Sequence, residues 1–213
     1  MKKTIVCFGD SNTWGYNAEN ESRFAEEVRW TGRLASMLGD NFRVIEEGLS
    51  GRTSVIDDPL FEGLNGLTYI DPCLRSHSPL DLVIIMLGTN DTKERFSLTS
   101  YNIAQGILRI AQKAKQSMTG INQQSPEVLI ISPPRIGGKY RHATIGDAMG
   151  DGCAEKSAHL AAHLEKLIDQ EQFHFLDATS IPMNEIDYMH LDEGGHKLLA
   201  QLVFDKLNQI LLT

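Results

Sequence analysis

Small polar residues follow three apolar runs of this sequence, and together they could carry out acyl transfer. Ser11 comes soon after the first run, Gly51 after the second and Asn90 after the third. A serine hydroxyl can attack a carbonyl carbon, while backbone N–H groups and an asparagine amide can bind the oxyanion that forms. Gly51 offers its N–H without a side chain that would block approach. Ser11 would contribute both its hydroxyl and its own N–H.

A serine nucleophile needs a general base, and His190 is the predicted one. Asp187 lies three residues before it, a spacing at which a carboxylate can reach one ring nitrogen and leave the other free. Asp192, the rival partner, is interpreted as the N-cap of the last helix. His159 and His163 stand four residues apart, but lysines flank them on the same helical stripe. That pattern favours a solvated helix face over a metal site.

Several of these residues also have an ordinary structural interpretation. A serine such as Ser11, taken alone, is more often a helix cap, and an asparagine such as Asn90 more often holds a turn. Asp91 cannot donate to an oxyanion when ionised, so we expect it to orient its loop. Ser50 is a competing nucleophile, but its surroundings lack the G-x-S-x-G elbow. The catalytic interpretation depends on all of these groups occurring together.

The elements that must position these residues are strands and helices in alternation. Short apolar runs, each followed closely by Gly, Pro, Asp or Ser, predict strands over 4–8, 42–49, 80–88, 127–134 and 173–178. Apolar residues at helical spacing predict helices over 30–38, 101–117, 153–170 and 194–211. His196 falls within the last of these as a surface or packing residue. The alternation predicts an α/β fold, a five-stranded parallel sheet with helices on both faces, in a single domain over 1–213.

Three longer segments that follow strands have no regular pattern: 16–29, 50–78 and 135–152. In open α/β sheets ligands bind at the carboxyl ends of the strands, which is where these segments begin. We therefore expect them to wall a pocket or to form contacts between subunits.

The composition limits the classes of partner. The net charge is -8 and the pI about 5.3, which disfavours nucleic acid and membrane surfaces. The three cysteines are widely spaced, which fits neither a disulfide framework nor a metal site, and Cys7 is predicted to lie in the core. The first apolar run is too short for a signal peptide, and no run approaches the ~20 residues that span a bilayer. We expect a cytoplasmic protein that acts on a small molecule.

These blocks resemble the SGNH, or GDSL, hydrolase family. In the family's order they are Gly9–Asn12 (nucleophile block), Gly48–Gly51, Gly88–Asp91 and Asp187–His190, and the resemblance covers nearly the whole chain. Stretches such as VRWTGRLASML and LDLVIIMLGTNDT look closest to the arylesterase/acyltransferase branch. This resemblance implies a flavodoxin-like three-layer α/β/α sandwich, no metal or cofactor, and assembly as a homo-oligomer. It also implies that Ser11, Asp187 and His190 are catalytic and that Ser11, Gly51 and Asn90 form the oxyanion hole.

Two residues depart from the family pattern. Asn12 stands where the family's older name expects leucine, and Leu191 follows His190 where proline is frequent. Neither change removes a group that the chemistry needs. Beside the nucleophile, Asp10 and Asn12 are predicted to fix the turn, and with Trp14 they are the candidate residues of the substrate pocket.

We predict a serine esterase that hydrolyses short-chain carboxylic esters, acetyl or aryl, through an acyl-enzyme on Ser11. Short acyl chains are expected because no large apolar lid or interfacial helix is visible. An acyltransferase or perhydrolase, or a deacetylase of sugar esters, could use the same site. A non-catalytic flavodoxin-like module that binds flavin or phosphate is a more distant alternative, without a G-x-G-x-x-G or Walker pattern to support it.

Overall fold

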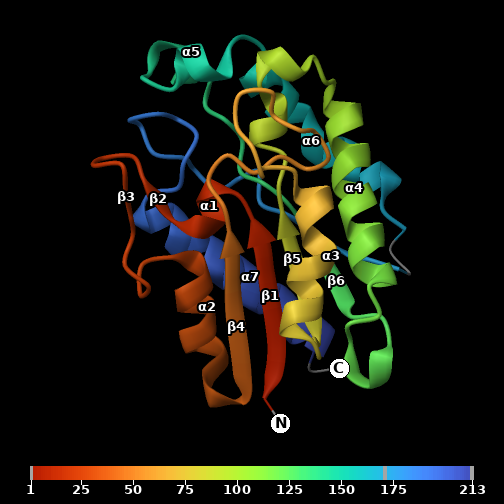
Figure 1. Cartoon of the computed structure of the whole chain (residues 1–213). Coiled ribbons are helices and arrows are strands. Elements are labelled where there is room, and N and C mark those ends of the chain that lie inside the picture. The colour runs from red at the N-terminus through yellow and green to blue at the C-terminus, as the bar shows by residue number, and fades with distance from the viewer. Residues whose placement is uncertain (1, 170–171, 212–213) are drawn as a thin grey trace.

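A parallel sheet forms the centre of the computed structural model, which describes residues 2–169 and 172–211 of the chain. Its strand order is β4-β1-β5-β6-β7 (Figure 1). This is the flavodoxin-like doubly wound order. Strand β4 lies on one side of β1, and β5, β6 and β7 follow one another on the other side. The bounds are β1 (Lys3–Gly9), β4 (Phe42–Gly48), β5 (Leu82–Met86), β6 (Glu127–Ser132) and β7 (His174–Asp177). All five predicted strands are confirmed, with ends that differ by two residues at most.

Helices cover both faces of the sheet, as predicted. One face carries α3 (Gly66–His77), α4 (Ser100–Gln116) and α6 (Cys153–Leu167), and the other carries α2 (Trp30–Leu38) and α7 (Glu193–Leu211). Strand β5 is buried along its whole length because both of its faces are covered. The helix predicted over 153–170 ends at Leu167, and residue 170 lies outside the described residues. Among the described helices, none has both the length and the hydropathy needed to cross a membrane.

The prediction of an irregular segment over 50–78 is wrong for Gly66–His77, which forms helix α3. Pro72 lies inside this helix, where proline removes a backbone donor and normally breaks the helical pattern. Asn65 caps the first turn with its side chain, and Ile70 and Leu74 are fully buried against the sheet. The burial of this apolar face stabilises a helix that the local sequence disfavours.

The remaining irregular segments lie at the carboxyl ends of the strands. Figure 1 shows β2 (Tyr16–Asn17), β3 (Ser22–Arg23) and α5 (Gly146–Met149) beside and above these ends. The other short elements are α1 (Ser11–Trp14), η1 (Gly39–Asn41), η2 (Asn90–Thr92), η3 (Glu94–Phe96), η4 (Ile121–Gln123) and η5 (Gly138–His142). Helices α1 and η2 place Ser11 and Asn90 at the same edge of the sheet, because β1 and β5 are parallel neighbours.

Candidate active site

Ser11 lies on a sharp turn between β1 and α1. Asp10, not Ser11, caps the helix, because its Oδ1 accepts a hydrogen bond from the N–H of Asn12 at 3.0 Å. The Ser11 hydroxyl therefore has no capping role. A Cβ added to Gly9 would lie 2.1 Å from Oγ1 of Thr13, so the turn requires glycine before the Asp10–Ser11 pair.

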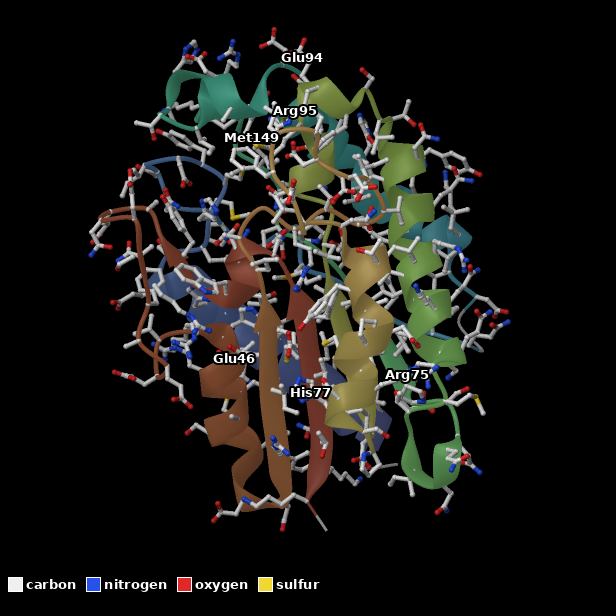
Figure 2. All side chains as sticks on the ribbon, in the orientation of Figure 1. Glu46, Arg75, His77, Glu94, Arg95 and Met149 are labelled. Carbon is white, nitrogen blue, oxygen red and sulfur yellow. The ribbon has the colours of Figure 1, made fainter. Side chains whose placement is uncertain are left out.

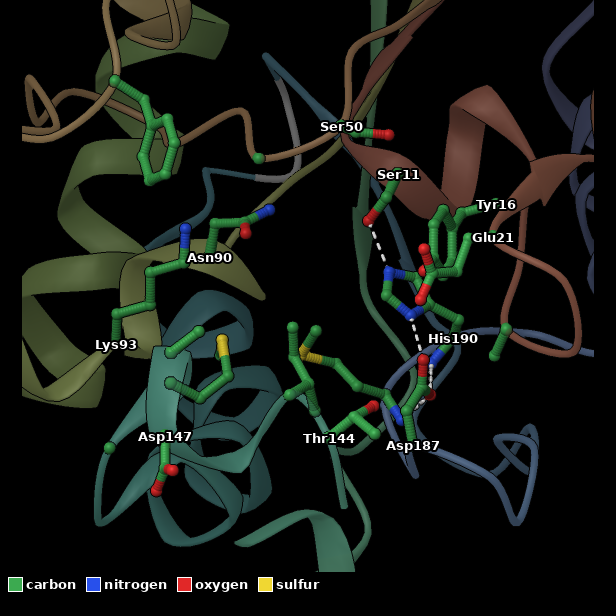
Figure 3. Close-up of a pocket in the computed structure, with 18 of the residues that line it drawn as sticks. Ser11, Tyr16, Glu21, Ser50, Asn90, Lys93, Thr144, Asp147, Asp187 and His190 are labelled. Carbon is green, nitrogen blue, oxygen red and sulfur yellow. Dashed lines mark hydrogen bonds and ion pairs between the residues drawn. The ribbon is translucent and has the colours of Figure 1, made fainter.

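The Ser11 hydroxyl begins a chain of two hydrogen bonds through the ring of His190 (Figure 3). Its Oγ lies 2.8 Å from Nε2 of His190, and Nδ1 of that ring lies 2.6 Å from Oδ2 of Asp187. All three residues are at most 5% exposed. Burial favours a higher pKa for Asp187, but the hydrogen bond and charge of His190 outweigh it and hold the pKa at about 2. The ionised carboxylate thus orients the ring so that Nε2 can take a proton from the hydroxyl.

The loop that carries Asp187 also fixes its carboxylate. Oδ1 accepts hydrogen bonds from the backbone N–H groups of Met189 and His190, at 2.9 and 3.0 Å, and from Nδ2 of Asn184 at 2.9 Å. Nδ2 of Asn184 also donates to the carbonyl of His190 at 2.8 Å, and its Oδ1 accepts from the N–H of Asp187. Asn184 was not predicted from the sequence. Its place in a polar loop, where asparagine commonly bonds the backbone two or three residues on, is the signal that points to it.

Asn12 joins the nucleophile turn to the loop of His190. Its Nδ2 donates to the carbonyl of Met189 at 3.2 Å, and its Oδ1 accepts from the N–H of Leu191 at 2.9 Å. Asn12 therefore holds both neighbours of His190 in the chain. A leucine at this position, as the older family name expects, could not make either bond.

The predicted oxyanion donors face the same cavity as the Ser11 hydroxyl. Gly51 has a φ of +85°, a conformation that favours glycine. Nδ2 of Asn90 donates to the carbonyl of Arg52 at 3.2 Å, which orients its amide. Among the described residues, none accepts a hydrogen bond from the backbone N–H of Ser11 or of Gly51. These two N–H groups are available to a bound oxygen atom.

Buried polar side chains hold the turns around the cavity in place through hydrogen bonds. Nη1 of Arg52 donates to the carbonyls of Gly9, at 2.8 Å, and of Glu47. This links the turn after β4 to the nucleophile turn. Asp91 accepts from the N–H of Ser54 at 2.9 Å and from its hydroxyl, which agrees with the predicted orienting role.

The cavity has a volume of about 670 Å³ and lies over the carboxyl ends of the strands. The three segments predicted to wall a pocket all contribute to it, through residues 16–21, 50–61 and 144–150. The segments 90–95 and 186–190 complete the wall. Figure 2 shows Glu94, Arg95 and Met149 at this end of the molecule, away from Glu46 and His77.

Asp10, Asn12 and Trp14, the candidate residues of the substrate pocket, are not among the residues that line this cavity. Asp10 and Asn12 are 1% exposed and use their side chains in the cap and the loop contact. Burial raises the pKa of Asp10 to about 6. The ring of Trp14 lies 5.3 Å from the guanidinium of Arg23. Tyr16 lines the cavity instead, with its ring centroid 4.4 Å from that of His190.

Three other residues considered from the sequence do not belong to the hydrogen-bonded chain of Ser11, His190 and Asp187. Asp192 caps α7 by accepting from the N–H of Gly195 at 2.7 Å, which confirms that prediction. His196 is fully buried in the core side of α7, where its Nδ1 accepts from the N–H of Trp30 at 3.2 Å. Ser50 is exposed in the cavity wall, without a histidine partner among the described residues.

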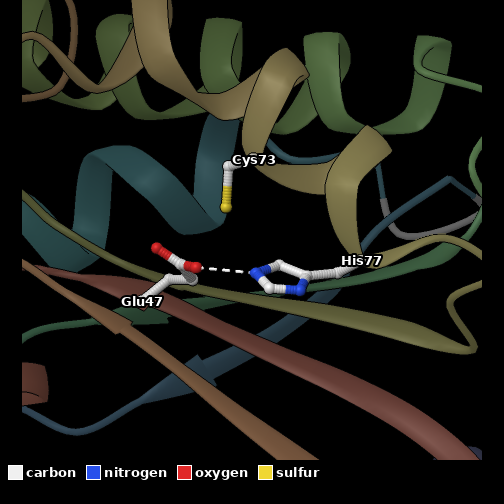
Figure 4. A group of neighbouring side chains, drawn as sticks. All are labelled: Glu47, Cys73 and His77. Carbon is white, nitrogen blue, oxygen red and sulfur yellow. Dashed lines mark hydrogen bonds and ion pairs between the residues drawn. The ribbon is translucent and has the colours of Figure 1, made fainter.

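Three side chains that could ligate a metal lie together between β4 and α3, outside the cavity (Figure 4). The ligand atoms of Glu47, Cys73 and His77 lie within 4.8 Å of one another, and Glu47 Oε1 lies 2.7 Å from Nε2 of His77. Burial and the charge of Glu47 raise the pKa of Cys73 to about 12. A protonated thiol beside a hydrogen-bonded Glu47–His77 pair is an ordinary packing arrangement.

Comparison with known proteins identifies the family of this site. The model of the GDSL-like Lipase/Acylhydrolase family matches residues 7–198. The chain belongs to this family. The predicted family is therefore confirmed, and the chain is a hydrolase of the GDSL type. The search of curated proteins gives no match.

Solved structures of this type superpose over almost the whole chain. The native aryl esterase of M. smegmatis is 39% identical, with a TM-score of 0.88 and coverage of 98% of this chain and 100% of that one. A carbohydrate acetylesterase from Sinorhizobium meliloti is 38% identical, with the same TM-score and coverage. A G-D-S-L family lipolytic protein from Veillonella parvula, 17% identical with a TM-score of 0.65 over 95% of this chain and 97% of that one, shares the fold.

Proposed function

We propose that this GDSL hydrolase is a serine esterase that cleaves short-chain carboxylic esters through an acyl-enzyme on Ser11. The observation that carries the proposal is the hydrogen-bonded chain from the Ser11 hydroxyl through His190 to Asp187, which opens into the cavity. A serine hydroxyl is a weak nucleophile at neutral pH, and it needs a base at this distance and a carboxylate that orients the base.

The steps follow from the positions of the atoms. Nε2 of His190 takes the proton of the Ser11 hydroxyl as Oγ attacks the ester carbonyl carbon. Asp187 stabilises the imidazolium that forms. The N–H groups of Ser11 and Gly51 and the amide of Asn90 bind the oxyanion. His190 then gives its proton to the alcohol oxygen as the ester bond breaks, and water hydrolyses the acyl-enzyme with His190 again as base.

The alternative functions differ in the alcohol part of the ester and in the molecule that accepts the acyl group. Two relatives more than 35% identical over nearly the whole chain carry the names aryl esterase and carbohydrate acetylesterase, so aryl acetates and acetylated sugars are the proposed substrates. Rates on these two classes decide between them. An acyltransferase would partition its acyl-enzyme toward an added alcohol rather than water, and product ratios measure this. We also propose that residues 1–213 form a single domain and assemble as a homo-oligomer in the cytoplasm.

The test is hydrolysis of p-nitrophenyl acetate by the Ser11→Ala variant. Activity should disappear, because the nucleophilic oxygen is gone while the rest of the site is intact. Ser180→Ala, which removes the same atom from an exposed position outside the cavity, is the control and should retain activity. An Ser11→Ala protein that folds and keeps its turnover would rule out the proposed nucleophile.

A further inference from the structure

The cavity wall beside Asn90 holds a largely buried lysine whose ion pair is long and shared with an arginine. Lys93 lines the cavity and is 8% exposed. Its Nζ forms an ion pair with Oδ2 of Asp58 at 3.7 Å. This ion pair is longer than a well-formed hydrogen bond, and it leaves donors of the ammonium for a further acceptor. Burial and the charge of Arg95 lower the pKa of Lys93, and Asp58 opposes both.

The carboxylates near Lys93 also bind other groups. Asp58 accepts from Nη2 of Arg95 at 2.6 Å and from the N–H of Leu60 at 3.0 Å. Asp91 is occupied by the N–H and hydroxyl of Ser54. An ammonium has three donors, and a long ion pair to a shared carboxylate offsets only part of the cost of burying its charge. An acceptor that a ligand brings into the cavity would recover part of this cost.

The position of Lys93 in the cavity indicates which part of an ester substrate it would contact. Figure 3 shows Lys93 and Asn90 on one side of the cavity, with His190 and Asp187 on the other. In the proposed mechanism the alcohol oxygen must reach His190 to receive its proton. The acyl part is then the part of the substrate that can extend toward Lys93.

The acidic side chains of the cavity lie away from this position or are paired. Glu21 lies on the His190 side, beside Tyr16. Asp147 pairs with Arg141 at 2.8 Å, and Glu94 accepts from the N–H of Asp151. A negative group would be disfavoured on the His190 side and stabilised beside Lys93, so the charges also select an orientation.

We propose that Lys93 binds a carboxylate at the far end of the acyl group, so that the enzyme favours monoesters of short dicarboxylic acids. This inference rests on the proposed esterase function. It concerns which acyl groups the site selects, and not the steps of catalysis. The charge-assisted hydrogen bond from the ammonium distinguishes these substrates from esters whose acyl chains end in a methyl group.

The experiment measures kcat/KM for the monoethyl esters of succinic, glutaric and adipic acids. Each is compared with the ethyl ester of the straight-chain monocarboxylic acid of equal carbon number, with acid release followed by titration. For the preferred length, the ratio of monoester to neutral ester should fall ~10–100-fold in Lys93→Met. Lys197→Met, which removes an exposed lysine on α7 outside the cavity, should keep the wild-type ratio. An equal ratio in wild type and Lys93→Met overturns the proposal.

Two further measurements distinguish a failure of this proposal from a folding defect and from a failure of the proposed esterase function. If Lys93→Met does not fold, the wild-type enzyme decides: a neutral ester preferred at all three lengths overturns the inference, and a preferred monoester supports it. Neutral esters that are hydrolysed by wild type but not by Ser11→Ala support the esterase function whatever the selectivity. A wild-type enzyme that hydrolyses no ester of either kind overturns both proposals.

Discussion

Replacing Asp187 by asparagine should stop catalysis by reversing the tautomer of His190. Oδ1 of Asp187 accepts from three donors, the N–H groups of Met189 and His190 and the amide of Asn184. An asparagine here must keep its carbonyl oxygen at that position, because an NH₂ group would face three donors. Its NH₂ then replaces Oδ2 and points at Nδ1 of His190. Nδ1 must accept that bond, so the ring proton moves to Nε2, which can no longer take the proton of Ser11.

The expected loss in kcat is ~10⁴-fold, or ~5.4 kcal/mol of activation free energy, as for the same tautomer reversal in other serine triads. The 2.6 Å contact and the pKa of about 2 at Asp187 indicate a strong interaction that the amide cannot replace. The assay is p-nitrophenyl acetate hydrolysis at neutral pH. Asp205→Asn removes an equal charge from an exposed position on α7 and serves as the control.

The result that would refute this reasoning is a well-folded Asp187→Asn variant with a loss below ~10-fold. Thermal unfolding monitored by circular dichroism verifies the fold. Such a result would mean that Asp187 does not determine which nitrogen of His190 carries the proton.

Two other substitutions test the site and the core. Asn90→Ala should lower kcat ~10²–10³-fold with little change in KM, because the donor acts on the oxyanion; a raised KM with unchanged kcat would contradict this. Burial and the charge of Arg33 lower the pKa of His196 from 6.5 to about 4, so the unfolded chain takes up the proton first as pH falls, and stability is lost between these values. The cost is ~2–3 kcal/mol at about pH 4.5. In urea unfolding, His196→Asn, which can still accept from Trp30, should remove this part of the pH dependence; an unchanged dependence would exclude His196 as its source.

The strands and the shared edge of Ser11, Gly51 and Asn90 were predictable from local patterns. Continuous apolar runs mark strands buried on both faces, and parallel strands bring their carboxyl ends to one edge. The pairing of His190 with Asp187 followed from their spacing and is seen in the structure. Each of these inferences needs only the near neighbours in the chain.

The predictions that failed depend on contacts between distant segments. Helix α3 was missed because Pro72 disfavours it locally, while the apolar side chains that stabilise it pack on the sheet. The ring of Trp14 lies against Arg23 on the β2–β3 hairpin, a contact that the local sequence does not show. Lys93 could not be recognised as a cavity residue, because a lysine after a 3₁₀ turn is usually exposed.

The distribution of hydrogen bonds around the cavity separates the frame of the site from its binding surface. Asn12, Asn184 and Asp187 use both ends of their polar groups within the protein, so they fix geometry and have little left for a ligand. Among the described residues, the N–H groups of Ser11 and Gly51 have no acceptor, and the ammonium of Lys93 has a long ion pair to Asp58. Donors in the cavity wall whose pairing is missing or incomplete mark where substrate oxygens belong. A substrate with one oxygen at the reacting carbonyl and a second at the far end of its acyl group satisfies both sets.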